Sequence, residues 1–264
     1  MFDRRWAEGK IERFSSLATE IVALKPDAIV AETTAGAIAA QRATATIPIV
    51  MVGAADPVGS GLVASLARPG GNITGVANLE TELHVKGVEL LRAVVPKATR
   101  IAVLMSDNPA HPLQVKTIQD AAKAFGLTVL PTMARSSEEF EEAFRSMAKQ
   151  KAGALIQLGG APFSSTPANR DKLVELAAKT KLPAMYQNRW WVDVGGLMSY
   201  GVNPSKIWRL AATYVDKILK GAKPSQLPVQ QPSQIELVIN LKAAKALGLT
   251  IPQSLLLRAD QVIQ

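Results

Sequence analysis

The sequence of 264 residues contains no cysteine and only two histidines. Without cysteine there can be no thiolate nucleophile, cysteine-ligated zinc, iron–sulfur cluster or thiol redox chemistry. The two histidines, His84 and His111, leave little room for a histidine-rich metal site or a Ser–His triad. We expect both to lie at solvated helix starts.

Long apolar runs are also missing. No stretch approaches the ~20 consecutive apolar residues that span a bilayer, so the sequence predicts no transmembrane helix. What remains is an ordinary globular composition, with 48% hydrophobic and 20% charged residues. At roughly 100–200 residues per domain, the length suits one large domain or two small ones.

The charge balance is basic, with 30 Lys and Arg against 22 Asp and Glu and a net charge of +8. The basic side chains are scattered along expected helices and form no dense tract with interleaved aromatic residues. This pattern favours a solvated basic surface over a nucleic-acid interface. We therefore expect no nucleic-acid partner.

Sequence motifs for catalysis or nucleotide binding are absent. There is no G-x-G-x-x-G and no G-x-x-x-x-G-K-[ST], and Gly59-Ser60-Gly61 is only a near miss for G-x-S-x-G. Asp107, Asn108 and His111 lack a convincing metal-ligand spacing. The residues give no positive argument for an enzyme, and we predict no catalytic residue, no cofactor and no metal site.

Short apolar runs, nearly continuous in Ile, Val, Leu and Ala, recur between amphipathic segments. Such runs are typical of parallel strands that are covered on both faces. The predicted strands are Asp27–Ala31, Ile47–Gly53, Arg100–Met105, Leu127–Leu130, Ala154–Leu158 and Pro183–Tyr186. The sequence therefore predicts an α/β fold with parallel sheets.

Helix signals separate these strands. Ser136 and Glu139 have the spacing of a capping box that opens a helix. Thr166 places a capping residue before a proline at the first helical position. Gly221 stands where a helix that begins near Pro204 would end.

The alternation of strands and helices breaks at Arg68–Asn72 and at Gly195-Gly196, and a short extended run follows each break. If both runs are crossovers, the chain forms two Rossmann-like lobes joined by a multi-strand hinge. The predicted first lobe comprises residues 1–74 and 198–222, and the second comprises residues 75–197 and 223–264.

Polar and aromatic residues follow the predicted strands. Ligands of open α/β sheets bind beyond the carboxyl ends of the strands. Hydroxyl, amide and aromatic groups there suit a small polar ligand better than acid–base chemistry. The candidate ligand-binding residues are Thr33, Thr34, Asp56, Asn108, Phe163, Tyr186, Gln187 and Tyr200.

Each candidate also has a purely structural interpretation. Thr33 and Thr34, with the N–H groups after them, could hold a carboxylate or could cap a helix. Asp56 could bind a ligand ammonium or cap a turn. An aromatic clamp or simple core packing are the two alternatives for Phe163, Tyr186, Trp190, Trp191 and Tyr200.

Several segments together resemble one known family. The most specific is Arg68-Pro69-Gly70-Gly71-Asn72-Ile73-Thr74-Gly75; others are Arg5–Gly9, Asp56–Val63, Gly195–Gly201 and Glu236–Lys242. Over essentially its whole length, the sequence resembles the substrate-binding proteins of ABC transporters. Within them it is similar to the group that includes tryptophan- and other aromatic-amino-acid-binding members.

The resemblance implies a type I periplasmic-binding-protein fold whose two lobes close on a ligand by hinge motion. By motif position, it assigns ligand contacts to Thr33, Thr34, Asp56, Asn108, Tyr186, Gln187 and Tyr200. It also implies solute capture for an ABC importer, a permease partner in the membrane, and a periplasmic or extracytoplasmic location. The implied ligand is an amino acid or another small polar solute.

Two departures from the family pattern bear on these expectations. Relatives begin with a secretion signal and a first strand–helix unit, whereas this sequence begins at the equivalent of the second strand. We therefore expect Met1 to be an internal residue of a longer protein. Ala161 stands where relatives often carry an acidic residue, which leaves open whether the ligand is an amino acid.

Two other classes of function remain as alternatives. A ligand-sensing regulatory domain of the same fold would need an attached DNA-binding or signalling module, and the sequence shows none. A two-lobed α/β enzyme is a weaker alternative. Cofactor-independent racemases of that type use paired cysteines, and a metal-dependent transferase needs clustered carboxylates, where Asp107 stands alone.

Overall fold

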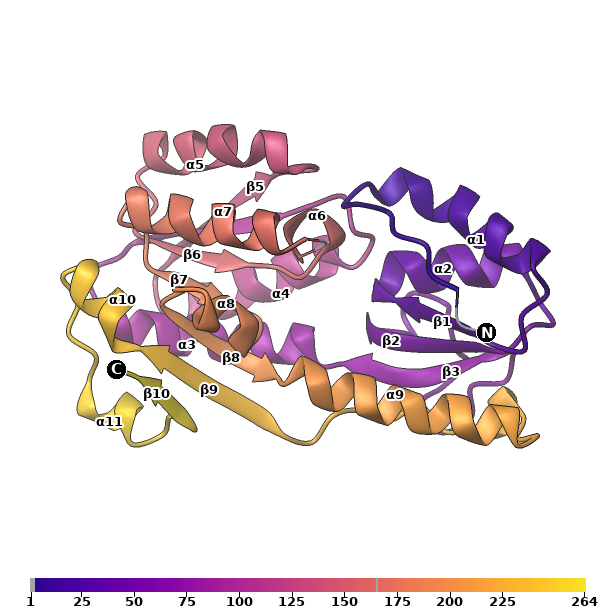
Figure 1. Cartoon of the computed structure of the whole chain (residues 1–264). Helices are drawn as coiled ribbons and strands as arrows, with labels where there is room; N and C mark the ends of the chain where they lie inside the picture. The colour runs from indigo at the N-terminus through magenta and orange to yellow at the C-terminus, as the bar shows by residue number, and fades with distance from the viewer. Residues whose placement is uncertain (1–2, 165) are drawn as a thin grey trace. The chain divides into compact units, whose positions relative to one another are not determined.

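A computed structural model describes residues 3–164 and 166–264, with the side chains of all of them except 80–82 (Figure 1). Met1, which the sequence pattern predicts to be internal to a longer protein, lies outside the described residues. The chain divides into two compact units. Unit 1 contains the residues up to Leu79, Asn108–Ala110 and Pro204–Ser233; unit 2 contains Glu80–Asp107, His111–Asn203 and Gln234–Gln264.

Unit 1 is built on a parallel sheet with the strand order β1-β2-β3. Its elements are η1 (Ile11–Arg13), α1 (Phe14–Ala23), β1 (Ile29–Glu32), α2 (Thr33–Ala43), β2 (Ile49–Ala55), β3 (Ile73–Asn78), α9 (Pro204–Leu219) and η3 (Pro224–Gln226). Both α2 and α9 contact β2, and Figure 1 shows the sheet between them. Because both faces are covered, buried apolar residues follow one another along β2, with Ile49 and Met51 fully buried.

The two edges of this sheet differ. Beside β3, Gln230 N donates to Gly75 O at 3.0 Å and Ala77 N donates to Gln230 O at 2.9 Å, so residue 230 covers that edge. At the other edge, β1 pairs only with β2. Within residues 3–164 and 166–264, no strand lies against the outer edge of β1. This edge offers unpaired backbone N–H and C=O groups.

Unit 2 is built on a larger sheet with the strand order β10-β9-β8-β7-β6-β4-β5. Its strands are β4 (Arg100–Met105), β5 (Thr128–Met133), β6 (Ala154–Gln157), β7 (Ala184–Tyr186), β8 (Met198–Val202), β9 (Ile235–Asn240) and β10 (Gln261–Ile263). Its helices are α3 (Glu80–Val94), α4 (His111–Lys123), η2 (Ser137–Glu139), α5 (Phe140–Lys149), α6 (Ala161–Ser164), α7 (Pro167–Lys179), α8 (Arg189–Asp193), α10 (Leu241–Ala246) and α11 (Gln253–Leu256).

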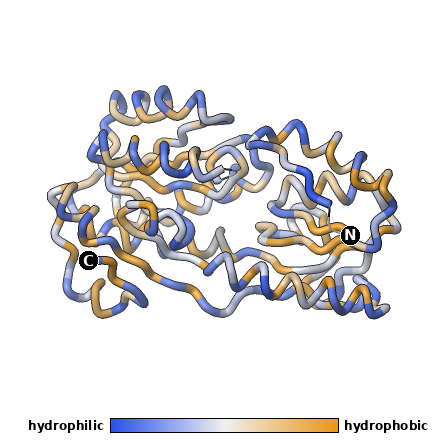
Figure 2. The backbone as a smooth tube through the Cα atoms, viewed as in Figure 1, coloured by the Kyte–Doolittle hydropathy of each residue, from blue (hydrophilic) through white to orange (hydrophobic). Residues whose placement is uncertain are grey.

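The two faces of this larger sheet carry separate cores. Along β4, Ile101 and Val103 pack with residues of α3 and α4, whereas Ala102 and Leu104 pack with residues of α5 and α7. Figure 2 shows hydrophobic colour along the strands, while the helices alternate between blue and orange. Each helix therefore buries one stripe against the sheet and presents the other side to water.

The α/β fold and the six strands expected from apolar runs are confirmed, with strand ends displaced by at most three residues. One feature differs from an all-parallel sheet. β9 runs antiparallel to β8, with Tyr200 opposite Leu237, and β10 runs parallel to β9. The last two strands therefore run against the other five.

The boundaries of the two units also differ from the predicted lobes. Met198–Val202 belongs to unit 2 rather than to the first lobe, because it pairs with β7 and β9. Residues 223–233 belong to unit 1, where Val229 N donates to Leu66 O at 2.7 Å. The first boundary lies at Leu79 rather than at residue 74, because β3 continues to Asn78.

The three helix signals have different outcomes. Thr166 caps α7 as predicted, since its Oγ1 accepts from Asn169 N at 3.1 Å. Gly221, with a φ of +96°, follows the end of α9 as predicted. The capping box is wrong: Ser136 makes no side-chain cap bond, and the Glu139 carboxylate accepts from Arg135 N at 2.9 Å, one residue too early.

We expect unit 1 to open locally more often than unit 2, because its sheet is small and one edge is open. Limited proteolysis with mass spectrometry of the fragments should give the first cuts in unit 1, with unit 2 peptides persisting. Cutting of both units at equal rates would contradict this prediction.

Candidate functional site

Thr33 and Thr34 open α2 directly after β1, at the carboxyl end of the unit 1 sheet. Thr33 has a φ of +67°, and its Oγ1 accepts a hydrogen bond from Gly36 N at 3.3 Å. Thr34 is buried, and its Oγ1 accepts from Ala55 N at 3.0 Å. The Thr33 hydroxyl therefore caps the helix, and the Thr34 hydroxyl ties α2 to the end of β2.

Asp56 follows β2 at the same edge of the sheet and is exposed. Its Oδ1 accepts from Gly59 N at 2.9 Å, and Ser60 N donates to the Asp56 carbonyl, also at 2.9 Å. A φ of +42° turns the chain at this residue. Asp56 thus caps the turn that follows β2. The residue as a whole remains exposed.

Asn108 lies in the loop between β4 and α4 and is 9% exposed. Its Oδ1 accepts from Ala110 N at 3.0 Å, the bond of an Asx turn. Asn108–Ala110 is grouped with unit 1, although Ser106 and His111 on either side belong to unit 2. The loop is therefore held to unit 2 at both of its ends.

The prediction that both histidines are solvated is wrong. His111 is fully buried and His84 is 6% exposed, near the starts of α4 and α3. Burial lowers the pKa of both imidazoles; with His111 as a neighbour, the pKa of His84 falls to about 3. The His111 ring accepts from Ser106 N at 2.8 Å and lies 2.6 Å from Gly159 O. These bonds explain how a polar ring is kept in a core.

Three of the candidate aromatic rings are core residues of unit 2. Phe163, Tyr186 and Trp191 are at most 1% exposed. The Tyr186 and Trp191 rings stack with centroids 5.2 Å apart and planes at 5°. Burial raises the pKa of the Tyr186 hydroxyl. These three rings therefore pack in the core of unit 2. Of the other two candidates, Trp190 is exposed and Tyr200 is half-buried.

Gln187 follows β7 and is half-buried, and two glycines of the segment Gly195–Gly201 lie close to Gln187 and to Tyr186 before it. A Cβ on Gly201 of β8 would lie 1.7 Å from Gln187 O, and a Cβ on Gly196 would lie 2.7 Å from the Tyr186 ring. Only glycine permits this approach. In the sequence these glycines indicate a break between segments and form part of a family motif, but they do not predict this close approach.

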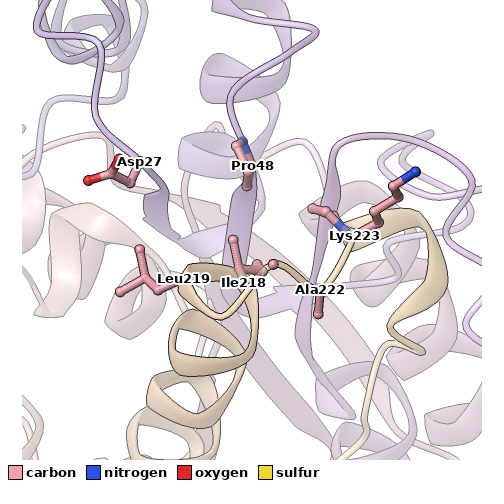
Figure 3. A pocket seen from close by; sticks show the side chains of 8 residues that line it. Asp27, Pro48, Ile218, Leu219, Ala222 and Lys223 are labelled. Atoms are coloured by element: carbon pink, nitrogen blue, oxygen red, sulfur yellow. The ribbon is translucent and has the colours of Figure 1, made fainter.

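Within unit 1 there is also a surface hollow of about 570 Å³ (Figure 3). It is lined by Asp27, Pro48, Ile218, Leu219, Gly221, Ala222, Lys223 and Pro224. Asp27 and Pro48 precede β1 and β2, so the hollow lies at the amino ends of the strands, opposite Thr33 and Asp56. In Figure 3 the charged ends of Asp27 and Lys223 point away from each other across it. None of the predicted ligand-binding residues lines this hollow.

The structure therefore brings Thr33, Thr34 and Asp56 together through the bond between α2 and the end of β2. In unit 2, Tyr186 and Gln187 are consecutive at the end of β7. Among the described residues, no group of three or more His, Cys, Asp and Glu side chains could hold a metal ion. In the same part of the chain, no helix has the length and apolar character needed to cross a membrane.

Comparisons with known proteins agree on one family. A family model described as "ABC transporter substrate binding protein" matches residues 1–263. The chain belongs to this family. A tyrosine-binding protein of Clostridioides difficile (strain R20291) is 29% identical over 245 residues, which cover 92% of this chain and 69% of that protein.

Two solved structures are similar in sequence and fold. The ABC domain from Streptococcus pneumoniae in complex with L-Trp is 31% identical, with a TM-score of 0.86; the match covers 97% of this chain and 85% of that one. A conserved domain protein from Vibrio cholerae is 30% identical, with a TM-score of 0.90 over 99% of this chain and 87% of that one. The fold is that of the type I periplasmic binding proteins, as the resemblance predicts.

We expect the buried histidines to make stability fall in mild acid. The pKa of His84 is lowered from 6.5 to about 3 on folding. Below pH 6.5 the imidazole is therefore protonated in the unfolded chain but still neutral in the folded chain. Between pH 7.5 and 5, His84 alone should cost about 2 kcal/mol of unfolding free energy. His111 contributes in the same direction, because its pKa is also lowered.

Urea unfolding of the wild type and of His84→Gln at both pH values tests this. The difference in unfolding free energy between pH 7.5 and 5 should be smaller in the variant, because glutamine does not titrate. The same pH dependence in both proteins would exclude His84 as the cause.

Proposed function

We propose that this protein is the extracytoplasmic solute-binding component of an ABC importer and that it captures a free amino acid with an aromatic side chain. The single observation that carries the proposal is the match of the family model to residues 1–263, and the similarity to a tyrosine-binding protein and to a domain in complex with L-Trp supports the ligand class. Closure of the two units on the ligand, and transfer of the ligand to a permease, are parts of the same proposal.

The polar loops of unit 1 suit the two charges of an amino acid. The first turn of α2 presents backbone N–H groups at the positive end of the helix dipole, which favours a carboxylate there. Thr33 and Thr34 fix the start of this helix through their hydroxyl bonds. The Asp56 carboxylate, exposed at the same edge, is the group that we assign to the ligand ammonium.

The amide and aromatic groups complete the proposed site. Asn108 and Gln187 carry amides that can bond polar atoms of the ligand, and Tyr200 is half-buried, so that part of it is accessible. Phe163 and Tyr186 are fully packed, so we assign them to the wall behind the ligand rather than to a mobile clamp. A binding protein of this kind needs no catalysis, because the ligand stabilises the closed form by binding it better than the open form.

Ligand binding is tested first by thermal shift. L-Trp or L-Tyr at about 100 times its Kd should stabilise the protein by ~2.7 kcal/mol and raise the melting temperature by about 5–10 °C. Indole-3-propionate, which lacks the ammonium, and L-tryptophanamide, which lacks the carboxylate, are the matched ligand controls and should give little shift. If no free amino acid raises the melting temperature, the proposed ligand class is wrong.

The ammonium contact is tested by Asp56→Asn. We expect at least tenfold weaker binding of the amino acid by calorimetry, because the ion pair between the ammonium and the carboxylate is replaced by a bond from the ammonium to a neutral amide oxygen. Asp120→Asn is the matched control, since Asp120 is an exposed carboxylate of α4 that pairs with Lys116 and Lys123. An unchanged Kd in Asp56→Asn would remove Asp56 from the site, and Glu32 at the end of β1 would then be tested in the same way.

A further inference from the structure

His111 bridges two loops of unit 2 through its imidazole ring. It is the first residue of α4, and its side chain is fully buried. Ser106 N, just after β4, donates to Nδ1 at 2.8 Å. Nε2 lies 2.6 Å from the carbonyl oxygen of Gly159, just after β6. One side chain is therefore bonded to the backbone beyond the carboxyl ends of two neighbouring strands.

These partners fix the chemical form of the ring. A carbonyl oxygen can only accept, so Nε2 must carry a proton and donate it to Gly159 O. In the neutral ring, Nδ1 is then unprotonated and accepts from Ser106 N. The Ser106 carbonyl oxygen and Oγ also lie near Nδ1, at 3.0 and 3.4 Å. Burial lowers the pKa of His111 and favours this neutral form, while the carbonyl oxygens of Gly159 and Ser106 and the carboxylate of Asp107 act in the opposite direction.

The bond from Ser106 to His111 closes a loop. Residues 107–110 lie between the two partners. The ring of His111, which follows these four residues, is therefore bonded to Ser106, which precedes them. Inside this short span, Asn108 forms its Asx turn with Ala110. The loop therefore has little freedom to change shape without breaking the His111 bond.

The second loop packs directly against the same ring. A Cβ on Gly160 would lie 3.0 Å from Ser106 Oγ, 3.5 Å from the Phe163 ring and 3.6 Å from His111 Cε1. The segment that leads into α6 is thus in contact with both the imidazole and the end of β4. The loop after β4 and the loop after β6 are held as one body.

We propose that His111 is a positioning residue for ligand binding: its neutral Nε2–H imidazole sets the relative placement of the loops that carry Asn108 and Phe163. The inference rests on the proposed function, because those loops count as ligand loops only if the protein binds a solute there. His111 is assigned no contact with the ligand. It acts through the two loops that it joins.

Three substitutions of His111 distinguish the contribution of the bond at Nδ1 from that of the bond at Nε2. His111→Asn keeps an acceptor near the place of Nδ1, His111→Gln keeps a donor near the place of Nε2, and His111→Ala keeps neither. We expect His111→Ala to bind L-Trp or L-Tyr at least tenfold more weakly, with partial recovery in the other two. Calorimetry is carried out well below each variant's melting temperature, so that loss of stability alone does not change the Kd.

His84→Gln is the matched control, since it alters the other buried histidine of unit 2, whose Nε2 has no hydrogen-bond partner among the described residues. It should lower the melting temperature but leave the Kd within about twofold of the wild type. Equal Kd values in wild type and His111→Ala would overturn the proposal. So would equal weakening of binding in His84→Gln and His111→Ala.

Two further measurements do not depend on a ligand. Nitrogen-15 NMR of the wild type should show the Nε2–H tautomer for His111, and amide exchange of Ser106 should be at least tenfold faster in His111→Ala, with α7 amides unchanged. If no amino acid binds to the wild type, the proposed function fails while these measurements still decide whether His111 holds the loops. An Nδ1–H tautomer, or unchanged Ser106 exchange, would overturn the positioning role by itself.

Discussion

The covering of the sheets on both faces constrains the rest of this protein. A strand buried on both sides has room for few polar side chains along its length, so most polar groups gather beyond its ends. β2 and β4 show this directly: β2 and the part of β4 after Arg100 contain no polar side chain, and Asp56 and Ser106 lie just beyond their carboxyl ends. The polar residues at the strand ends are consequently attached to a packed core.

Most polar groups in these loops already have a partner within the fold. Thr33 and Asp56 bond the backbone of the turns that they begin, Thr34 bonds the end of β2, and His111 bonds the ends of β4 and β6. Such bonds fix the loops before any ligand arrives. Loops that are fixed in advance lose less conformational entropy when a ligand binds, which favours affinity. The structural and functional interpretations of these residues are therefore compatible.

Features that depend on residues close together in the sequence could be predicted, and features that depend on distant segments could not. The strands could be predicted because continuous apolar runs report two-sided burial, and the caps at Thr166 and Gly221 because each depends on a few neighbouring residues. The burial of His84 and His111 could not, since it depends on helices and strands far apart in the chain. Nor could the antiparallel direction of β9, because it depends on how the chain returns after α9.

The sequence alone determined the fold class, the family and the absence of thiol chemistry, because these depend on composition, local pattern and motifs. Tertiary structure decided which candidate side chains are accessible. Tyr186 and Phe163 have the same kind of sequence signal as Tyr200, yet only Tyr200 is partly exposed. The physical reason is that exposure depends on what packs against a side chain from distant segments, such as Trp191 on Tyr186.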